Sequence, residues 1–226
     1  MTRGSFHDSL ARNEADLLLL GDLAATAVGR AVEAVATRDA GLARRVIAED
    51  DPIDDLYLRL DHGLLSLLAL QAPVAADLRL ISAILHSCLH LERVGDQAVN
   101  VAKLFLATQA LPGSDAMRLQ LREMGERVVE MLQVALASFA ARDLEMANRL
   151  PGLDDLVDRL NRASHLEALK LAGDPHALDW GLHMNLAARA LERVGDNAVD
   201  IGEQVAFLVT GEFREFTDAS HEVTLS

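Results

Sequence analysis

Residues 91–100 read LERVGDQAVN and residues 191–200 read LERVGDNAVD, so nearly the same phrase occurs twice at an offset of 100 positions. Among the first nine positions the only change replaces Gln97 by Asn197. A second pair of segments also corresponds, TRDAGLARRVIAEDDPID at 37–54 and ARDLEMANRLPGLDDLVD at 141–158, at an offset of 104. Two paired segments in the same order indicate an internal duplication, and this duplication decides the architecture.

The apolar residues recur at three- and four-residue spacing along the chain, which predicts helices and no strands. Helix-breaking residues divide the pattern into six long helices, roughly 8–38, 41–71, 74–110, 115–141, 143–172 and 175–210. The prediction is an all-α protein of two tandem, internally repeated three-helix bundles. Residues 1–110 form the first repeat, residues 111–210 form the second, and residues 211–226 form a polar tail.

The bulk composition excludes several classes of protein. A formal net charge of −14 opposes binding to nucleic acid phosphates, and an aromatic fraction of 4% leaves few platforms for stacking single strands. Cys88 is the only cysteine, so an intramolecular disulfide is excluded and a reducing compartment is expected. No segment is long and apolar enough to span a bilayer, and the first residues lack a signal-peptide pattern. We therefore expect a cytoplasmic protein that does not insert into a membrane.

The repeated phrase places oxygen-bearing side chains on one stripe of each third helix. In the first repeat this stripe continues to Lys103, whereas in the second it carries four acids. The stripe residues are Glu92, Asp96 and Asn100 in the first repeat, and Glu192, Asp196, Asp200 and Glu203 in the second. The second helices supply matching stripes, namely Asp50, Asp54 and Asp61 in the first repeat and Asp154, Asp158 and His165 in the second.

These stripes are locally unfavourable, because like charges four residues apart destabilise a helix and a glycine inside a helix costs about 1 kcal/mol relative to alanine. Gly95 and Gly195 both lie beside the acids. A locally unfavourable feature that occurs in both repeats indicates a function or a close packing contact. Facing stripes of oxygen ligands predict a site for a divalent or multinuclear metal, with Fe, Zn, Mn and Mg as candidates and with Asp61 and His165 as additional ligands. The rival interpretation is a solvated acidic face, partly neutralised by Arg93 and Arg193.

Four other residues that could bind metal or shape the site are not expected to be ligands of the acidic stripes. His86 and His90 have the four-residue spacing of some zinc ligands, but His90 lies about 160° around the helix from Glu92, so we expect a separate surface or packing pair. Cys88 is expected to be a core thiol. Pro52 either re-aims the neighbouring carboxylates through a kink or marks a break in the helix.

The repeated LERVGD phrase, the pattern D-x-x-[IV]-D on the second helices and the segment QAPVAADLRL at 71–80 together resemble the PhoU family of phosphate-signalling proteins. The resemblance covers roughly residues 8–210 and implies two similar three-helix bundles. It also implies multinuclear metal clusters on the E-x-x-x-D stripes, with the helix-2 acids Asp50, Asp54, Asp154 and Asp158 joining them. Asp77 and Arg79 match a family pattern for which the residues alone indicate no role.

The resemblance implies a non-enzymatic regulator that acts between a phosphate ABC transporter ATPase and a membrane sensor histidine kinase. Such a regulator represses the phosphate-starvation response when phosphate is plentiful, and we expect it to form a homodimer. A carboxylate-bridged metalloenzyme is one alternative, although the residues three positions after Glu92 and Glu192 are glycines and not the histidines of di-iron bundles. A metal-free structural adaptor is the other. A count of stripe carboxylates predicts that the second repeat holds metal more tightly than the first.

Overall fold

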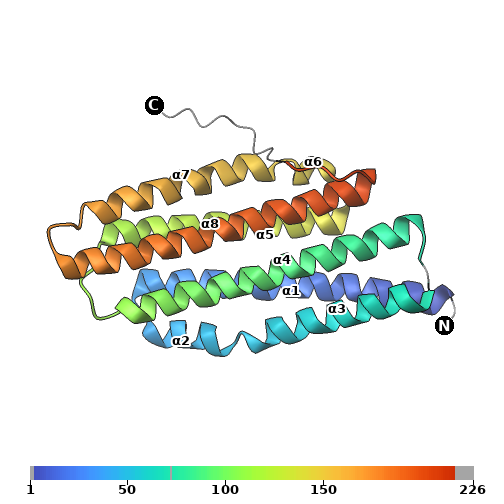
Figure 1. Cartoon of the computed structure of the whole chain (residues 1–226), viewed down its shortest axis with the longest axis horizontal. Helices are drawn as coiled ribbons and strands as arrows, with labels where there is room; N and C mark the ends of the chain where they lie inside the picture. The colour runs from blue at the N-terminus through green and yellow to red at the C-terminus, as the bar shows by residue number, and fades with distance from the viewer. Residues whose placement is uncertain (1–2, 72, 217–226) are drawn as a thin grey trace.

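A computed structural model describes residues 3–71 and 73–216, and within them every regular element is an α-helix. The first half of the chain contains α1 (Arg3–Thr37), α2 (Ala40–Ala48), α3 (Asp51–Gln71) and α4 (Ala75–Thr108). The second half contains α5 (Asp115–Ala141), α6 (Leu144–Ala147), α7 (Leu150–Leu169) and α8 (Pro175–Thr210). The long helices run side by side along the long axis of the molecule (Figure 1). The prediction of an all-α fold is confirmed.

The turn that follows the first long helix is built in the same way in both halves. Arg38 and Arg142 adopt left-handed conformations, with φ of 60° and 56°, and they end α1 and α5. The next residues, Asp39 and Asp143, then cap the following helices, because each carboxylate accepts a hydrogen bond of 2.9 Å from the backbone N–H three residues later. The correspondence between the two Arg-Asp pairs therefore holds in three dimensions.

The helices predicted at 41–71 and 143–172 are each broken in two, so the expectation of one continuous helix in each of these ranges was wrong. The first is divided into α2 and α3, and the second into α6 and α7. Pro52 and Pro151 are the second residues of α3 and α7. A proline has no N–H to donate, which costs little in the first turn of a helix but removes a hydrogen bond from its interior. Pro52 therefore marks a helix start.

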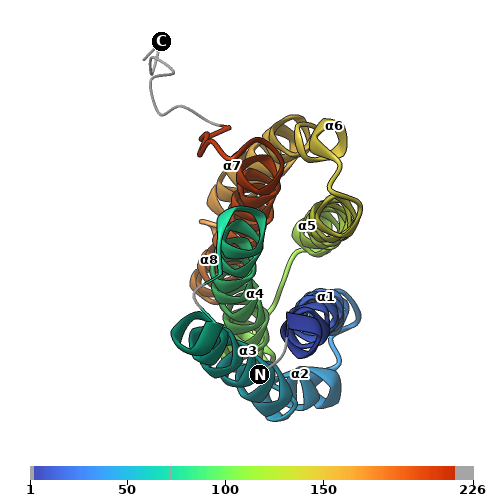
Figure 2. The ribbon, with the colours of Figure 1, turned by 90° about the vertical axis from the view of Figure 1, so that its right-hand side faces the viewer.

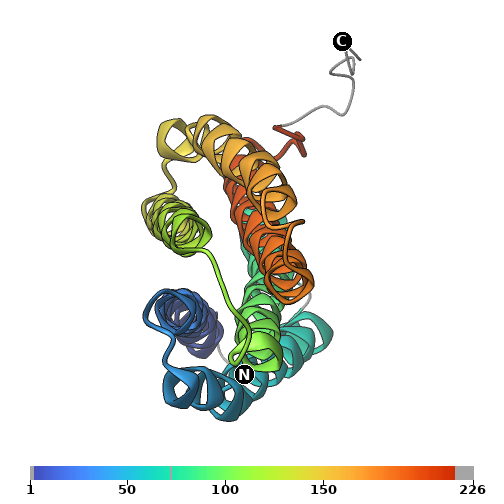
Figure 3. The same cartoon turned by 90° about the vertical axis from the view of Figure 1, so that its left-hand side faces the viewer.

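The two halves pack side by side around α4 and α8. Views along the helices show these two next to each other in the middle, with α3 beside α4 and α7 beside α8, while α1 and α5 lie together on another face (Figures 2 and 3). A single cluster of buried apolar side chains runs through both halves. Each half therefore forms a bundle of one long helix, one broken helix and another long helix, and the bundles share one core.

A polar contact crosses the boundary between the bundles at the one position where the repeated phrase differs. The Nδ1 atom of His90 lies 2.9 Å from Oδ1 of Asn197. In the other copy, Gln97 stands where Asn197 does, and its Oε1 is buried without a hydrogen-bond partner. The position that corresponds to His90 there is Ala190, which has no polar side chain. The boundary between α4 and α8 is therefore asymmetric in its polar contacts.

The segment after α8 turns back on the helix, where the backbone N–H of Phe216 donates a hydrogen bond of 2.7 Å to Oε1 of Glu203. The rest of the predicted tail, residues 217–226, lies outside the described residues. Across the part of the chain that the structure describes, none of the helices is long and apolar enough to cross a membrane.

The contact between α1 and α5 yields the first testable prediction. A Cβ atom added at Gly125 would lie 2.5 Å from Cγ2 and 2.9 Å from Cβ of Val32, so the helices would have to move apart. We expect Gly125→Ala to lower the free energy of unfolding by about 1–2 kcal/mol, because overpacking outweighs the gain in helix propensity. Urea unfolding measures this change.

The matched control is Gly29→Ala, on the exposed face of α1 with no atom within 4 Å of the added Cβ. This substitution should stabilise the protein by up to about 1 kcal/mol. Equal stability of the two variants would show that α1 and α5 do not approach closely at Gly125.

Candidate functional site

The first acidic cluster lies in the groove between the start of α3 and the middle of α4. Asp50 directly precedes α3 and Asp54 is in its first turn, while Glu92 and Asp96 are one turn apart on α4. Burial raises the pKa of Asp50, Asp54 and Glu92, and repulsion from Asp96 raises each pKa further. The ammonium group of Lys103 acts in the opposite direction on the pKa of Asp50. The structure thus brings these four predicted acids together.

The second acidic cluster lies between α7 and α8. Asp154 and Asp158 are one turn apart on α7, and Glu192 and Asp196 are one turn apart on α8. Burial, followed by repulsion from Asp196, Asp158 and Glu192, raises the pKa of Asp154 to about 7. Burial, followed by repulsion from Glu192 and Asp158, raises the pKa of Asp196 to about 6. Four carboxylates that face one another in this way favour binding of protons or cations.

The glycine of the repeated phrase lies directly against an acid in each cluster. A Cβ atom at Gly195 would lie 2.7 Å from Oδ1 of Asp154, and one at Gly95 would lie 3.6 Å from Oδ1 of Asp50. At Gly95 the added atom would also lie 3.1 Å from a methyl carbon of Ile53. The two glycines therefore let a carboxylate from the neighbouring segment approach the helix backbone. They also confirm that Asp50 and Asp154 occupy corresponding places in the two bundles.

The donor set of the second cluster fits a hard divalent cation. Oδ1 of Asp154 is buried and has no hydrogen-bond partner, and an unpaired buried oxygen of this kind is stabilised by a cation. In residues 3–71 and 73–216, no three or more His, Cys, Asp or Glu side chains already stand in an arrangement that could hold a metal ion. The four carboxylates fit a cation in chemical type and in number.

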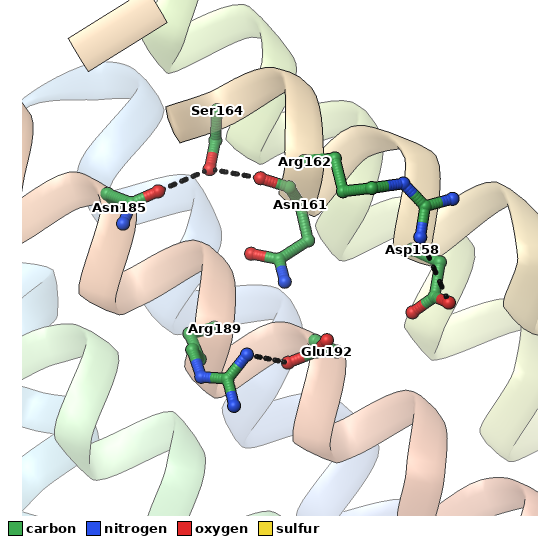
Figure 4. A network of polar contacts seen from close by, with 7 residues as sticks. All are labelled: Asp158, Asn161, Arg162, Ser164, Asn185, Arg189 and Glu192. Atoms are coloured by element: carbon green, nitrogen blue, oxygen red, sulfur yellow. Dashed lines mark hydrogen bonds and ion pairs between the residues drawn. The ribbon is translucent and has the colours of Figure 1, made fainter. Parts of the chain in front are cut away.

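Arginines line the solvent side of the second cluster (Figure 4). Nη1 of Arg162 lies 3.5 Å from Oδ2 of Asp158, and Nη1 of Arg189 lies 3.3 Å from Oε2 of Glu192. Both arginines are largely exposed, and ion pairs of this kind contribute little. In the first cluster the charge of Arg93 lowers the pKa of Glu92, although burial and the neighbouring acids outweigh it. The arginines therefore reduce the repulsion between the acids without removing it.

The remaining predicted ligands have other surroundings. Asp61 lies further along α3, where its charge adds to burial in raising the pKa of the Cys88 thiol to about 12, and Cys88 is a core residue as predicted. Asn100 and His165 are exposed. Two further predicted ligands have partners at the boundary between the bundles or in the returning tail. These are Asp200, whose Oδ2 lies 3.2 Å from Nδ1 of His90, and Glu203, which accepts the hydrogen bond from Phe216.

The structure gives Asp77 and Arg79 positions that sequence reasoning did not supply. Oδ2 of Asp77 lies 3.6 Å from Nε2 of His7 near the start of α1. Arg79 packs against Gly211, which ends α8 with a φ of 78°. A guanidinium is favourable there because the last carbonyls of a helix lack intrahelical partners and carry partial negative charge. This segment therefore connects the start of α4 to the start of α1 and to the end of α8.

The raised pKa values predict how the stability of the metal-free protein depends on pH. In the unfolded chain aspartates titrate near pH 4, whereas the pKa is about 7 for Asp154 and about 6 for Asp196 in the folded protein. Between these limits the folded state retains protons that the unfolded state releases. The free energy of unfolding should therefore fall as pH rises from about 4 to about 7.

Urea unfolding with a chelator present, at pH 5 and pH 8, measures this decrease. The double variant Asp154→Asn/Asp196→Asn should show a smaller decrease, while Asp22→Asn, at an exposed position of α1, serves as the matched control. The prediction is wrong if the double variant and the control lose the same stability over this range.

The chain has relatives of known family over nearly its whole length. A family profile described as "PhoU domain" matches residues 17–105 and 121–205, one match in each repeat. A Pseudomonas aeruginosa protein named "Phosphate-specific transport system accessory protein PhoU homolog" is 35% identical over 217 residues, which cover 96% of this chain and 88% of that protein. A Caulobacter vibrioides protein of the same name is 34% identical and covers 92% of this chain and 91% of its own length.

Solved structures show the same similarity. The crystal structure of PhoU from Pseudomonas aeruginosa matches with a TM-score of 0.87 at 35% identity, over 92% of this chain and 100% of that one. The phosphate transport system regulatory protein PhoU from Streptococcus pneumoniae matches with a TM-score of 0.85 at 29% identity, over 92% and 99% of the two chains. These names are not enzyme names, in agreement with the expectation of a non-enzymatic protein. The chain belongs to the PhoU family.

Proposed function

We propose that this protein is a cytoplasmic accessory regulator of phosphate uptake and of phosphate-starvation signalling. It acts as an adaptor between a phosphate ABC transporter ATPase and a sensor histidine kinase, and it represses the starvation response when phosphate is plentiful. The observation that carries the proposal is similarity along nearly the whole chain to proteins named as accessory or regulatory components of phosphate transport. The molecule is expected to work as a homodimer.

Exposed apolar side chains on α7 and α8 support an adaptor role. Leu166 and Leu169 near the end of α7 are 60% and 53% exposed, and Leu182 and Leu186 near the start of α8 are 47% and 53% exposed. These two stretches are neighbours, because the Ser164 hydroxyl donates a 2.9 Å hydrogen bond to Oδ1 of Asn185 (Figure 4). Contiguous exposed apolar side chains are typical of surfaces that bind another protein, and we propose that these leucines belong to such a surface.

The acidic clusters are proposed to bind metal as part of this role. Asp50, Asp54, Glu92 and Asp96 would hold the cation of the first cluster, and Asp154, Asp158, Glu192 and Asp196 that of the second. A bound divalent ion supplies positive charge that offsets repulsion among the carboxylates. The protein positions these oxygens between two helices, and the adjacent glycines let the carboxylates come close to the helix backbone. The ion would therefore stabilise the contact between the second and third helices of each bundle.

A carboxylate-bridged metalloenzyme is the second candidate, and the motif sequence opposes it. Di-iron bundles place a histidine three residues after a ligating glutamate. Here those positions are Gly95 and Gly195, where an added Cβ would lie 3.1 Å from Ile53 and 2.7 Å from Oδ1 of Asp154, so a side chain would displace these neighbours. Because these residues are glycines, the carboxylates of Asp50 and Asp154 can lie close to the backbone of α4 and α8. A histidine at either position would keep the carboxylate away.

The two clusters should differ in metal affinity. The second has the larger pKa shifts, with a pKa of about 7 for Asp154 and about 6 for Asp196, and its cation would experience less screening. In the first cluster the ammonium group of Lys103 lowers the pKa of Asp50, and the same positive charge would repel a bound cation. We therefore expect Glu92→Gln/Asp96→Asn protein, in which the second cluster is intact, to retain more metal during a chelator titration than Glu192→Gln/Asp196→Asn protein. The reverse order would mean that cluster geometry outweighs charge.

A deletion strain tests the regulatory proposal. In a bacterium that encodes this chain, removing it should derepress phosphate-starvation genes in high phosphate, and a plasmid copy should restore repression. A Leu166→Ser/Leu186→Ser copy should restore less repression than Leu119→Ser, which changes an exposed leucine of α5 outside the proposed surface. Normal repression in the deletion strain would contradict the proposed function, whereas full rescue by the double variant would contradict only the surface.

A further inference from the structure

A pocket between the two bundles contains the histidine pair that the sequence set apart. It lies at the boundary of α4 and α8 and has a volume of about 400 Å³. Ser82, His86 and His90 from α4 line one side of it. The other side is formed by Asp200, Glu203, Gln204 and Phe207 of α8 and by Phe213 of the returning segment. Two imidazoles and two carboxylates thus face one space, apart from the four-acid clusters.

The hydrogen bonds of both histidines determine which ring nitrogen carries the proton. Nδ1 of His86 lies 2.8 Å from the backbone carbonyl oxygen of Ser82, which can only accept. Nδ1 of His90 lies 2.9 Å from Oδ1 of Asn197 and 3.2 Å from Oδ2 of Asp200. Both Nδ1 atoms therefore act as donors, and in the neutral rings both Nε2 atoms carry a free lone pair. Histidines that ligate metals are commonly oriented by such a bond from the other nitrogen to a carbonyl or a carboxylate.

The spacing of the pair suits chelation. Residues four apart on a helix lie on one face, with their Cβ atoms about 5–6 Å apart, and two histidines at this spacing ligate zinc in other proteins. Packing does not require histidines here, because the corresponding positions of the second repeat are Leu186 and Ala190. The pair is therefore a feature of the first repeat alone.

A carboxylate of the same pocket can supply a third ligand. Glu203 is only 7% exposed, and its Oε1 accepts the hydrogen bond from the Phe216 backbone, so Oε2 is the oxygen that can turn toward the imidazoles. Asp200 already orients His90 through Nδ1. Imidazole nitrogens with a single carboxylate favour zinc, nickel, copper or iron over magnesium and calcium, which prefer oxygen ligands.

We infer that Nε2 of His86, Nε2 of His90 and the carboxylate of Glu203 form a binding site for a divalent transition-metal ion between the two bundles. The Ser82 carbonyl, Asn197 and Asp200 orient the imidazoles through their contacts with the Nδ1 atoms. Rotation of Glu203 completes the ligand set, in keeping with the absence, among the described residues, of three such side chains already converging. A bound ion would link α4 to α8 and so link the two repeats. This inference stands independently of the proposed function.

Zinc titration of the full-length protein tests the site. Histidine side-chain NMR spectra should show the ring signals of two of the eight histidines moving with Zn²⁺, and both signals should be absent from His86→Gln/His90→Gln protein. Competition with a chromophoric chelator should give one equivalent of Zn²⁺ fewer for this variant than for the wild type. Glu203→Gln keeps an oxygen that can accept the Phe216 bond, and it should weaken binding at this site about tenfold or more.

The matched control is His183→Gln, since Nδ1 of His183 also bonds to the carbonyl four residues earlier, at 2.9 Å, but His183 lies outside the pocket. It should bind Zn²⁺ as the wild type does. Asp154→Asn/Asp196→Asn protein should retain the two histidine shifts, which separates this site from the second acidic cluster. Equal zinc stoichiometry and affinity in the His86→Gln/His90→Gln and His183→Gln proteins would overturn the inference. Loss of the histidine shifts in the aspartate variant would also overturn it.

Discussion

The packing of α4 against α8 determines where every other feature of the molecule lies. These two helices carry the repeated phrase, and they meet in antiparallel fashion, since His90 contacts Asn197 while Arg79, nearer the start of α4, contacts Gly211 at the end of α8. With their inner faces buried against each other, the acid stripes are turned toward α3 on one side and α7 on the other. The two acidic clusters therefore lie on separate grooves of one rigid pair of helices.

The acids in each groove are held together against their own repulsion. Folding forces Asp154 and Asp196 into a partly desolvated space, and the consequence is the rise of both pKa values toward neutrality. Burial of the apolar core shared by both bundles favours folding, and this favourable free energy offsets the repulsion between the acids. A protein built for stability alone would have replaced one of the acids by a neutral residue. The repetition of the arrangement in both bundles supports the proposal that the repulsion serves cation binding.

Much of this arrangement could be predicted from the sequence, because the signals are local. Helical periodicity, the paired Arg-Asp turns and the spacing of acids four apart all depend on residues within one or two helical turns. The breaks near Pro52 and Pro151 were harder to predict, since a proline is compatible with either a kink or a helix start. The approach of Asp50 to Gly95 and of Asp154 to Gly195 did not follow from the repeat alone, because the offset is 104 between the two acids and 100 between the two glycines.

The contacts that sequence reasoning missed all join residues distant in the chain. Neither Arg79 against Gly211 nor Glu203 with the Phe216 backbone leaves a periodic pattern. Arg79 reaches Gly211 because the start of α4 meets the end of α8, and Glu203 pairs with the Phe216 backbone because the segment after α8 turns back on that helix. The sequence predicted His86 and His90 as a separate surface or packing pair, and it did not show that α8 and the returning segment form a pocket with them. Helical geometry correctly separates His90 from the face of α4 that carries Glu92. The face that carries the histidines packs beside α8, which belongs to the second repeat.

The duplication itself explains how such a contact could arise on one side only. When two copies of one helix pack about an approximate two-fold axis, a contact between position i of one and position j of the other recurs with the roles exchanged. The contact of His90 with Asn197 therefore has a counterpart in Ala190 and Gln97, where no histidine is present and Oε1 of Gln97 is left buried without a partner. The apolar packing of α4 on α8 is supplied by both copies, so one of the two polar positions was free to change. The acids one turn apart in the repeated phrase, Glu92 with Asp96 and Glu192 with Asp196, were kept in both copies, whereas the histidines lie at the boundary between the copies and occur once. A single central pocket with two histidines, flanked by two similar acidic clusters, is the arrangement that follows from a duplicated helix with one asymmetric contact.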